Sequence, residues 1–143
     1  MPIIQIDSNF SVSKQIELTE LEDVKAAGFK TVISNRPDGE EADQPAAAIV
    51  GTSVDSAGLT FTHQPVVSGK ITDEDVAAFG QFLAAAEKPV FAFCRTGTRC
   101  THLWAMATVT VDNLEEVVAK AQAAGYDLTA LRPRLEALAA RRA

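Results

Sequence analysis

The chain has 143 residues, of which 47% are hydrophobic and 22% are charged, a composition typical of a folded domain rather than of a disordered chain. Its 13 lysines and arginines face 19 acidic residues, which gives a formal net charge of −6 at pH 7. A net anion is a poor nonspecific partner for nucleic acid or an anionic membrane. The chain also lacks an apolar run of the roughly 18–20 residues that cross a bilayer, and the pattern of its first seven residues does not suggest export. We therefore expect a cytoplasmic protein with no nucleic-acid or membrane partner.

The two cysteines, Cys94 and Cys100, lie six positions apart. This spacing does not suit a disulfide framework, which joins distant parts of a chain. The two histidines, His63 and His102, do not complete a spacing typical of a zinc site. We expect no metal site and no cofactor. Two thiols close together in a reducing compartment indicate a role in a chemical reaction instead.

The first part of the chain predicts a short opening strand or hairpin and then a helix. Residues 3–6 and 10–12 are the apolar runs of that hairpin. The segment Thr19-Glu20-Leu21-Glu22 has the form of a capping box, which predicts that a helix begins there. Gly28 occupies the usual position just after the end of such a helix.

A buried strand is predicted next, because Lys30–Ser34 is a short run of mainly β-branched residues. It ends in a turn-rich loop over residues 35–40. Asp43 then predicts the start of a helix that runs to about Ala57.

The remaining elements continue the alternation of strands and helices. Residues 59–67 contain a strand, and Thr72 is expected to cap a helix whose apolar face carries Val76, Phe79, Phe82 and Leu83. The run Pro89–Phe93 is apolar on both faces, which is typical of a central parallel strand. A helix follows from about Cys100 to Thr110, and Asp112 and Asp127 are candidate caps for two further helices.

This alternation predicts an α/β fold, a single domain over residues 1–143 with a parallel sheet between helices. In such sheets, ligands bind outside the carboxyl ends of the strands. The loops that carry Arg36 and Cys94 both leave strands at that edge. The sequence therefore places a candidate site between them.

The loop after Pro89–Phe93 combines a thiol, a glycine and arginines in the order CRTGTRC. Such a loop before a helix can turn its backbone N–H groups inward to bind an anion. Cys94 at its base should have a depressed pKa and act as a nucleophile. Arg99 can clamp an oxyanion, and Gly97 permits the tight turn. A cysteine after an apolar strand is often only a core residue, but packing does not require this polar context.

The C-x4-R spacing from Cys94 to Arg99 resembles the active loop of rhodanese sulfurtransferases, and phosphatases of the tyrosine and dual-specificity classes carry a similar C-x5-R loop. The wider sequence resembles the beta-lactamase-hydrolase-like phosphatase domain over nearly all of residues 1–110. This resemblance implies the fold of dual-specificity protein phosphatases, as a single-domain parallel-sheet α/β sandwich. The family is described both as phosphatase and as sulfur transferase. The segments that carry the resemblance are Lys30–Glu40, Gln44-Pro45, Ile71-Thr72, Phe91–Arg99 and Leu103-Trp104.

Three features of the sequence favour sulfur transfer over phosphate hydrolysis. Dual-specificity phosphatases supply an aspartate as general acid after the preceding strand, but residues 63–70 contain no carboxylate. Asp38 is the best substitute acid, although it equally suits a turn or a salt bridge to Arg36 or Arg95. The loop is also one residue shorter than in phosphatases, so its cradle should be narrower. Cys100 replaces the usual serine or threonine after the arginine.

We therefore expect a rhodanese-type sulfurtransferase that forms a persulfide on Cys94. Its substrate would be a small anion such as thiosulfate or a persulfide, and the resemblance suggests a persulfide-processing partner enzyme. Cys100 could resolve the persulfide or form a protective disulfide with Cys94. The alternatives are a phosphatase that forms a phosphoenzyme on Cys94 from a phosphate ester, and a non-catalytic anion-binding module. The expected site comprises Cys94, Arg99 and Asp38 as catalytic residues and Arg36, Arg95, Thr96, Gly97, Thr98 and Cys100 as binding residues.

Overall fold

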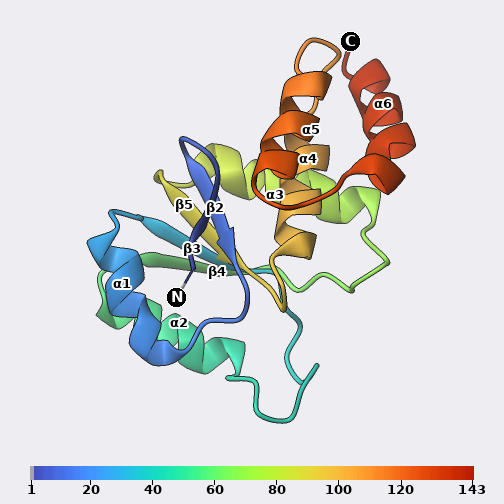
Figure 1. Ribbon diagram of the computed structural model, residues 1–143. Helices are drawn as coiled ribbons and strands as arrows, with labels where there is room; N and C mark the ends of the chain where they lie inside the picture. Colours follow the sequence, from blue (N-terminus) through green and yellow to red (C-terminus); the bar gives the residue numbers. More distant parts are fainter. Residues whose placement is uncertain (1) are drawn as a thin grey trace.

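The computed structural model of the protein describes residues 2–143. A five-stranded sheet in the order β1-β2-β5-β3-β4 crosses its middle (Figure 1). The pairs β2–β5, β5–β3 and β3–β4 are parallel, and β1 pairs with β2 as an antiparallel hairpin. Both the hairpin and the parallel sheet agree with the sequence-based predictions. The strands are β1 Ile4–Asp7, β2 Phe10–Ser13, β3 Thr31–Ser34, β4 Thr60–His63 and β5 Val90–Phe93.

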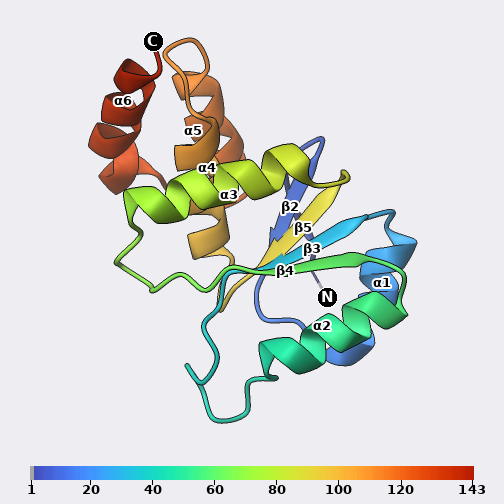
Figure 2. The ribbon, with the colours of Figure 1, turned by 180° about the vertical axis from the view of Figure 1, so that it is seen from behind.

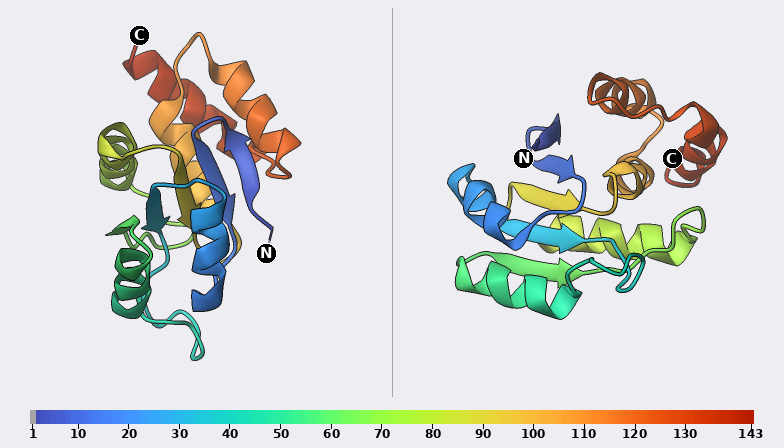
Figure 3. Two further views of the ribbon diagram at one scale, coloured as in Figure 1. Left: turned by 90° about the vertical axis from the view of Figure 1, so that its left-hand side faces the viewer. Right: turned by 60° about the horizontal axis from the view of Figure 1, so that its bottom comes forward.

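Helices cover both faces of this sheet, as Figures 1 and 2 show from opposite sides. Two of them, α1 and α2, pack on one face, and the other four lie on the opposite face (Figure 3). The helices are α1 Leu21–Ala26, α2 Ala47–Ser56, α3 Asp73–Ala85, α4 Thr98–Thr108, α5 Leu114–Ala123 and α6 Arg132–Arg141. Within residues 2–143, none of these helices has the length and apolar character that a membrane crossing requires.

The central strand β5 serves both hydrophobic cores, because alternate side chains of a strand point to opposite faces. Val90 and Ala92 pack in the core beneath α3–α6. Phe91 and Phe93 pack in the core beneath α1 and α2. All four side chains are buried, so β5 is the rigid support from which the cysteine loop leaves.

The start of α1 differs from the prediction. The capping box is formed by Glu17 and Glu20, whose side chain accepts the Glu17 N–H at 2.7 Å. This box opens a short 3-10 helix over Leu18–Glu20, and α1 follows directly. The predicted box starting at Thr19 is therefore wrong, since the polypeptide already turns two residues earlier. Gly28 has a φ of 95° after α1, as predicted.

Two predicted helix caps are also wrong. The residue before α2 is Ala46 rather than Asp43, and α2 begins four residues after Asp43. The first N–H of α2, on Ala47, is instead bound by the side chain of Asp38 at 2.8 Å. The residue before α5 is Asn113, one position after Asp112. A third predicted cap, Asp127, is wrong as well, since the residue before α6 is Leu131.

Helix α3 begins as predicted, with a reciprocal capping box. The Thr72 hydroxyl accepts the Asp75 N–H at 3.0 Å, and the Asp75 carboxylate accepts the Thr72 N–H at 2.9 Å. Val76 and Phe79 are buried in the core, but Phe82 is 37% exposed. Phe82 therefore lies at the margin of the apolar face rather than within it.

Candidate active site

The candidate site lies where the loops after β3, β4 and β5 meet, at the carboxyl edge of the parallel strands. The backbone N–H of Asn35 donates to the carbonyl of Phe93 at 2.9 Å, which joins the ends of β3 and β5. The N–H of Val66 donates to the carbonyl of Asn35 at 3.1 Å, which adds the loop after β4. The three loops thus form one connected edge, with Cys94 directly after β5.

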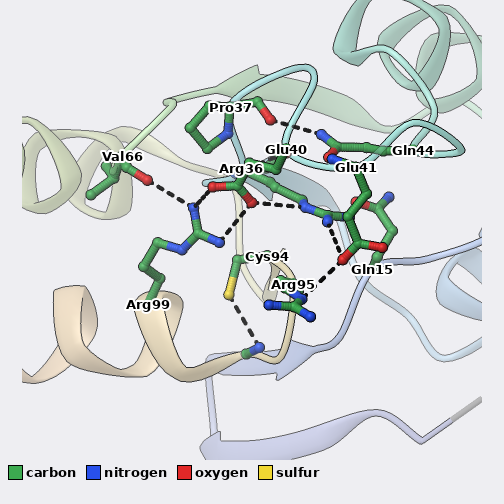
Figure 4. Close-up of polar contacts among 12 residues, drawn as sticks. Gln15, Arg36, Pro37, Glu40, Glu41, Gln44, Val66, Cys94, Arg95 and Arg99 are labelled. Carbon is green, nitrogen blue, oxygen red and sulfur yellow. Dashed lines mark hydrogen bonds and ion pairs between the residues drawn. The ribbon is translucent and has the colours of Figure 1, made fainter. Parts of the chain in front are cut away.

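The sulfur of Cys94 is surrounded by hydrogen-bond donors. The backbone N–H of Gly97 points at Sγ from 3.1 Å (Figure 4), and the backbone groups of Thr96 and Cys100 also hydrogen-bond to Cys94. The thiol of Cys100 donates a further hydrogen bond, and this contact contributes most to a pKa of about 5 for Cys94. Burial of Cys94 opposes this shift but does not cancel it. Cys94 is therefore a thiolate at neutral pH, the form that attacks electrophiles.

Gly97 allows the loop to close over this sulfur. Its φ is 88°, and it directly precedes α4. A Cβ at this position would overlap the hydroxyl oxygen of Tyr126. That hydroxyl donates to the carbonyl of Thr96 at 3.1 Å, and the Thr101 hydroxyl donates to the carbonyl of Gly97 at 2.9 Å. Tyr126 therefore holds the peptide that points its N–H at Cys94, and Thr101 holds the next peptide. Helix α4 begins at Thr98, two residues before the predicted start.

Arg99 is buried beside the loop, with 7% of its side chain exposed. Its guanidinium forms a two-point contact with the carboxylate of Glu40, with N–O distances of 2.8 and 3.0 Å, and donates to the carbonyl of Val66 at 2.9 Å (Figure 4). The hydrogen bond from Arg99 lowers the pKa of Glu40, which keeps this carboxylate ionised. The carboxylate of Glu40 thus occupies part of the Arg99 guanidinium, which was expected to bind the substrate anion.

Arg36 is enclosed by three acceptors rather than open to a ligand. Its Nε lies 2.9 Å from Glu40 and its Nη2 lies 3.0 Å from Glu41, while Nη1 donates to Gln15 at 3.1 Å. Glu41 also contacts the Nε of Arg95 at 2.9 Å. Only 4% of the Arg36 side chain is exposed, against 67% for Arg95. Arg36 therefore supports the site from inside, and Arg95 lies at its surface.

Glu40 and Glu41 were not among the residues predicted for the site. They follow Asp38-Gly39 in the loop after β3, where acidic residues are most simply interpreted as a solvated turn. Their arginine partners include Arg99, 59 positions away in the chain. The one signal in the sequence that pointed to them was their negative charge, because a buried arginine requires an acidic or polar partner.

Asp38, the predicted acid, contacts the start of α2 in the structure, and its catalytic role stays a prediction. Its Oδ1 accepts the Ala47 N–H at the start of α2. The predicted salt bridges to Arg36 or Arg95 do not form, since Glu40 and Glu41 take those positions. The hydrogen bond to Ala47 gives Asp38 a structural role that does not involve catalysis.

The predicted polar residues at the loop surface surround an open cleft. Thr96 and Thr98 are exposed, and their hydroxyls contact each other at 3.0 Å. A cleft of about 420 Å³ forms the mouth of the site, lined by Glu40, Glu41, Ser68, Arg95 and Arg99. A second cleft of about 330 Å³ shares Ser68, Arg95 and Arg99 with the first and extends toward Ile71, His102, Met106 and Leu131.

The two histidines lie in different parts of the site. The ring Nε2 of His63 lies 2.9 Å from the carbonyl of Arg36. His102 lines the second cleft, and burial lowers its pKa, so its ring is neutral at pH 7. Within residues 2–143, the side chains of histidine, cysteine, aspartate and glutamate do not gather into a group of three that could hold a metal ion.

Comparison with known proteins matches residues 3–111 to the family described as beta-lactamase hydrolase-like protein, phosphatase-like domain. The chain is 33% identical over 130 residues to a beta-lactamase hydrolase-like protein of Xylella fastidiosa. That alignment covers 90% of this chain but 30% of the relative, so the chain corresponds to less than a third of the length of that protein.

Solved structures share the fold over almost the whole chain. A crystal structure from Neisseria meningitidis, described as that of a candidate phosphatase, is 41% identical with a TM-score of 0.81 and covers 96% of this chain and 99% of the other. Tk-PTP is 18% identical with a TM-score of 0.70, over 97% of each chain, and shows the fold alone. From the family match and these structures, the chain belongs to the beta-lactamase hydrolase-like phosphatase-like domain family and has the fold of protein tyrosine and dual-specificity phosphatases.

Proposed function

We propose that the chain is a cysteine-dependent phosphatase and that its substrates are phosphate monoesters with a good leaving group, such as aryl phosphates. The observation that carries this proposal is the environment of Cys94, whose sulfur accepts the Gly97 N–H at 3.1 Å and has a pKa of about 5. A phosphoryl group needs an ionised nucleophile and nearby positive charge. The loop supplies the first, and Arg99 with Arg95 supplies the second.

The reaction would run in two displacements. The Cys94 sulfur attacks phosphorus, and the S–P bond forms as the P–O bond to the leaving group breaks. Water then attacks the phosphocysteine, which releases inorganic phosphate and returns the thiolate. In both steps, the negative charge on the equatorial oxygens is stabilised by the arginines and by the N–H groups of the loop.

The proposed restriction to good leaving groups follows from the carboxylates near the cleft. Asp38 binds the start of α2, and Glu40 is kept ionised by Arg99. Glu41 pairs with two arginines. Each of these carboxylates is thus held by another group of the protein rather than directed at the oxygen of a leaving group. A phenol, with a pKa of about 10, departs far more readily than an alcohol without help from an acid.

The second cleft supports the same substrate class. It adjoins Arg99 and presents the apolar side chains of Ile71, Met106 and Leu131, which would pack against an aromatic ring. TpbA of P. aeruginosa, which shares the fold with a TM-score of 0.68 at 17% identity over 97% of this chain and 88% of its own, has been crystallised in complex with pTyr. An aryl phosphate group attached to a protein or to a small molecule is therefore our proposed substrate.

A second candidate is the rhodanese-type sulfurtransferase expected from the sequence. The partners of Asp38, Glu40 and Glu41 described above also favour this activity. Sulfur transfer from thiosulfate to Cys94 requires no acid that protonates an oxygen leaving group. The phosphatase comes first because the matching family is described as a phosphatase-like domain and the 41% identical structure from Neisseria meningitidis is described as that of a candidate phosphatase. A non-catalytic anion-binding module ranks third, since such a module has no need of an activated thiolate.

We further propose that residues 1–143 act as one domain. The family match ends at residue 111, but Tyr126, beyond that limit, bonds to the carbonyl of Thr96 in the cysteine loop. The C-terminal helices would then contribute to the conformation of the active loop.

A paired assay of wild type and Cys94→Ser tests the proposal. One arm supplies an aryl phosphate and an alkyl phosphate, and the other supplies thiosulfate with cyanide. We expect Cys94-dependent release of phosphate from the aryl ester, much slower release from the alkyl ester, and little thiocyanate. Sulfur transfer without phosphate release would favour the second candidate. Anion binding without turnover in either arm, retained in Cys94→Ser, would favour the third.

A further inference from the structure

The second cleft, of about 330 Å³, differs in charge from the chain as a whole. The chain has a formal net charge of −6, yet three arginines line this cleft, Arg95, Arg99 and Arg134. Within residues 2–143, no aspartate or glutamate lines it. The proposed reaction uses Arg95 and Arg99 to stabilise the phosphoryl group. Arg134 is therefore a positive charge in the cleft that the reaction described above does not use.

We infer that Arg134 binds a second anionic group of the substrate, so that the cleft selects small aryl phosphates whose ring carries a carboxylate or a similar anion on a short side chain. This inference rests on the proposed phosphatase function, because it names the class of substrate that the same site accepts. Arg134 would determine specificity without taking part in the chemical step.

The cleft runs along α4, from the cysteine loop to the C-terminal helices. Arg99 lies in the first turn of α4, and Met106 lies about two turns, or about 10 Å, further along the helix axis. Helix α6 packs against α4 and contributes Arg134, and Leu131 directly precedes α6. Leu131 and Arg134 both follow residue 111, where the family match ends. This end of the cleft is thus outside the part of the chain that the family match covers.

The side chains of the cleft have an order that suits an aromatic ring between two anions. Arg95 and Arg99 lie at the mouth that the two clefts share. The apolar side chains of Ile71, Met106 and Leu131 also line the second cleft, where a ring would pack against them. Sites for small ligands span about 300–1,000 Å³. A cleft at the lower end of this range suits one ring with short substituents rather than a segment of polypeptide.

Arg134 has capacity to bind a ligand in addition to its protein partner. Its Nη2 contacts the carboxylate of Asp73 at 3.1 Å, where the starts of α6 and α3 lie side by side (Figures 1 and 2). Arg141 contacts the same carboxylate at 3.7 Å, so these three side chains carry a net positive charge. Asp73 is 60% exposed, and solvent weakens ion pairs of this kind. The planar fork of an arginine can bind a second acceptor beside the first.

Two substrates with matched leaving groups test the inference. The phosphate ester of para-hydroxyphenylpropanoate carries a carboxylate on a short side chain, and the ester of its methyl amide is neutral at that position. The side chain separates the carboxylate from the ring, so the two phenols have nearly the same pKa. A difference in kcat/KM therefore reports binding of the carboxylate. We expect the wild-type protein to prefer the acid about fivefold.

Two variants should change this preference in opposite directions. Arg134→Gln should abolish it, and Asp73→Asn should increase it by removing the carboxylate that competes for Arg134. Arg132→Gln is the matched control, because it removes the same charge from the first turn of α6 but Arg132 pairs with Glu115 and does not line the cleft. The control should keep the wild-type preference. Equal kcat/KM for acid and amide in the wild type, or a preference that persists in Arg134→Gln, would overturn the inference.

Calorimetric titration of Cys94→Ser with both esters separates this inference from the proposed function, because binding is measured without turnover. We expect the acid to bind about fivefold more tightly than the amide, and the added substitution Arg134→Gln should remove the difference. Turnover of both esters without a preference would refute the role of Arg134 and leave the phosphatase intact. Binding of the acid through Arg134 with no turnover in the wild type would refute the phosphatase and support the second anion site. Equal binding of the two esters would refute that site.

Discussion

The guanidinium of Arg99 and the carboxylate of Glu40 form a two-point ion pair across the mouth of the site, with N–O distances of 2.8 and 3.0 Å. Glu40 also contacts Arg36 at 2.9 Å, so it links a fully enclosed arginine to the one beside the active loop. This arrangement fixes the plane of the Arg99 fork before substrate arrives. Preorganised charge of this kind stabilises a transition state without the cost of reorienting dipoles.

Glu40→Gln should therefore impair catalysis through the position of Arg99. Loss of a charge-assisted contact with a buried arginine is expected to lower kcat/KM by about tenfold or more. Glu41→Gln is the matched control, because Glu41 contacts Arg36 and Arg95 but not Arg99. Steady-state kinetics on an aryl phosphate measures both. Equal losses in the two variants, or faster turnover in Glu40→Gln, would show that Glu40 does not position Arg99.

The pKa of Cys94 should be visible in the pH dependence of alkylation. With a pKa of about 5, the thiolate fraction rises through pH 5 and is nearly complete at pH 7. The rate constant for iodoacetamide should therefore rise with pH to a plateau, with its midpoint near pH 5 rather than near the ordinary cysteine value of about 8.5. Cys100→Ala should move the midpoint upward, since the Cys100 thiol stabilises the thiolate. A wild-type midpoint near 8.5 would contradict an activated nucleophile.

Gly97 and Tyr126 should behave as a coupled pair. Gly97→Ala places a Cβ against the Tyr126 hydroxyl at a φ of 88°, and left-handed backbone alone costs a residue with a Cβ about 1–2 kcal/mol. We expect a lower melting temperature and a large loss of kcat/KM. Adding Tyr126→Phe to Gly97→Ala removes the overlapping oxygen and should recover part of the stability. No recovery in the double variant would mean that backbone strain alone causes the loss.

Substitutions at Asp38 test whether the reaction proceeds without a general acid at this position. Asp38→Asn keeps an oxygen that can accept the Ala47 N–H, so we expect stability and kcat to stay close to wild type. Asp38→Ala removes that acceptor and should cost about 1 kcal/mol of stability. Thermal denaturation and the pH profile of kcat check both variants. A large drop in kcat for Asp38→Asn, with loss of the basic limb of the profile, would identify Asp38 as the general acid.

The sequence allowed the sheet and the cysteine loop to be predicted because their signals are local. The run Val90–Phe93 is apolar on both faces, as a strand between two layers of helices must be. The order of Cys94, Gly97 and Arg99 before a helix was enough to predict the turn over the sulfur. The contact of the Gly97 N–H with that sulfur follows from the same local geometry.

The parts that sequence reasoning missed depend on contacts between distant segments. Glu40 is assigned to Arg99 by the meeting of two loops 59 residues apart. Tyr126 reaches Thr96 because α5 and α6 pack against α4, the helix that follows the cysteine loop. The hydrogen bond from the Ala47 N–H to Asp38 was missed because the start of α2 was predicted at Asp43 rather than at Ala47. None of these pairings has a periodic signature in the chain.

In the proposed reaction, Cys94 carries the phosphoryl group during turnover. The most direct measurement mixes the wild-type protein with an aryl phosphate, quenches it with acid within the first turnover, and records the intact mass. We predict a covalent gain of about 80 Da that maps to Cys94 and that is absent from Cys94→Ser. Phosphate release without this adduct on Cys94, or an adduct on another residue, would contradict the account.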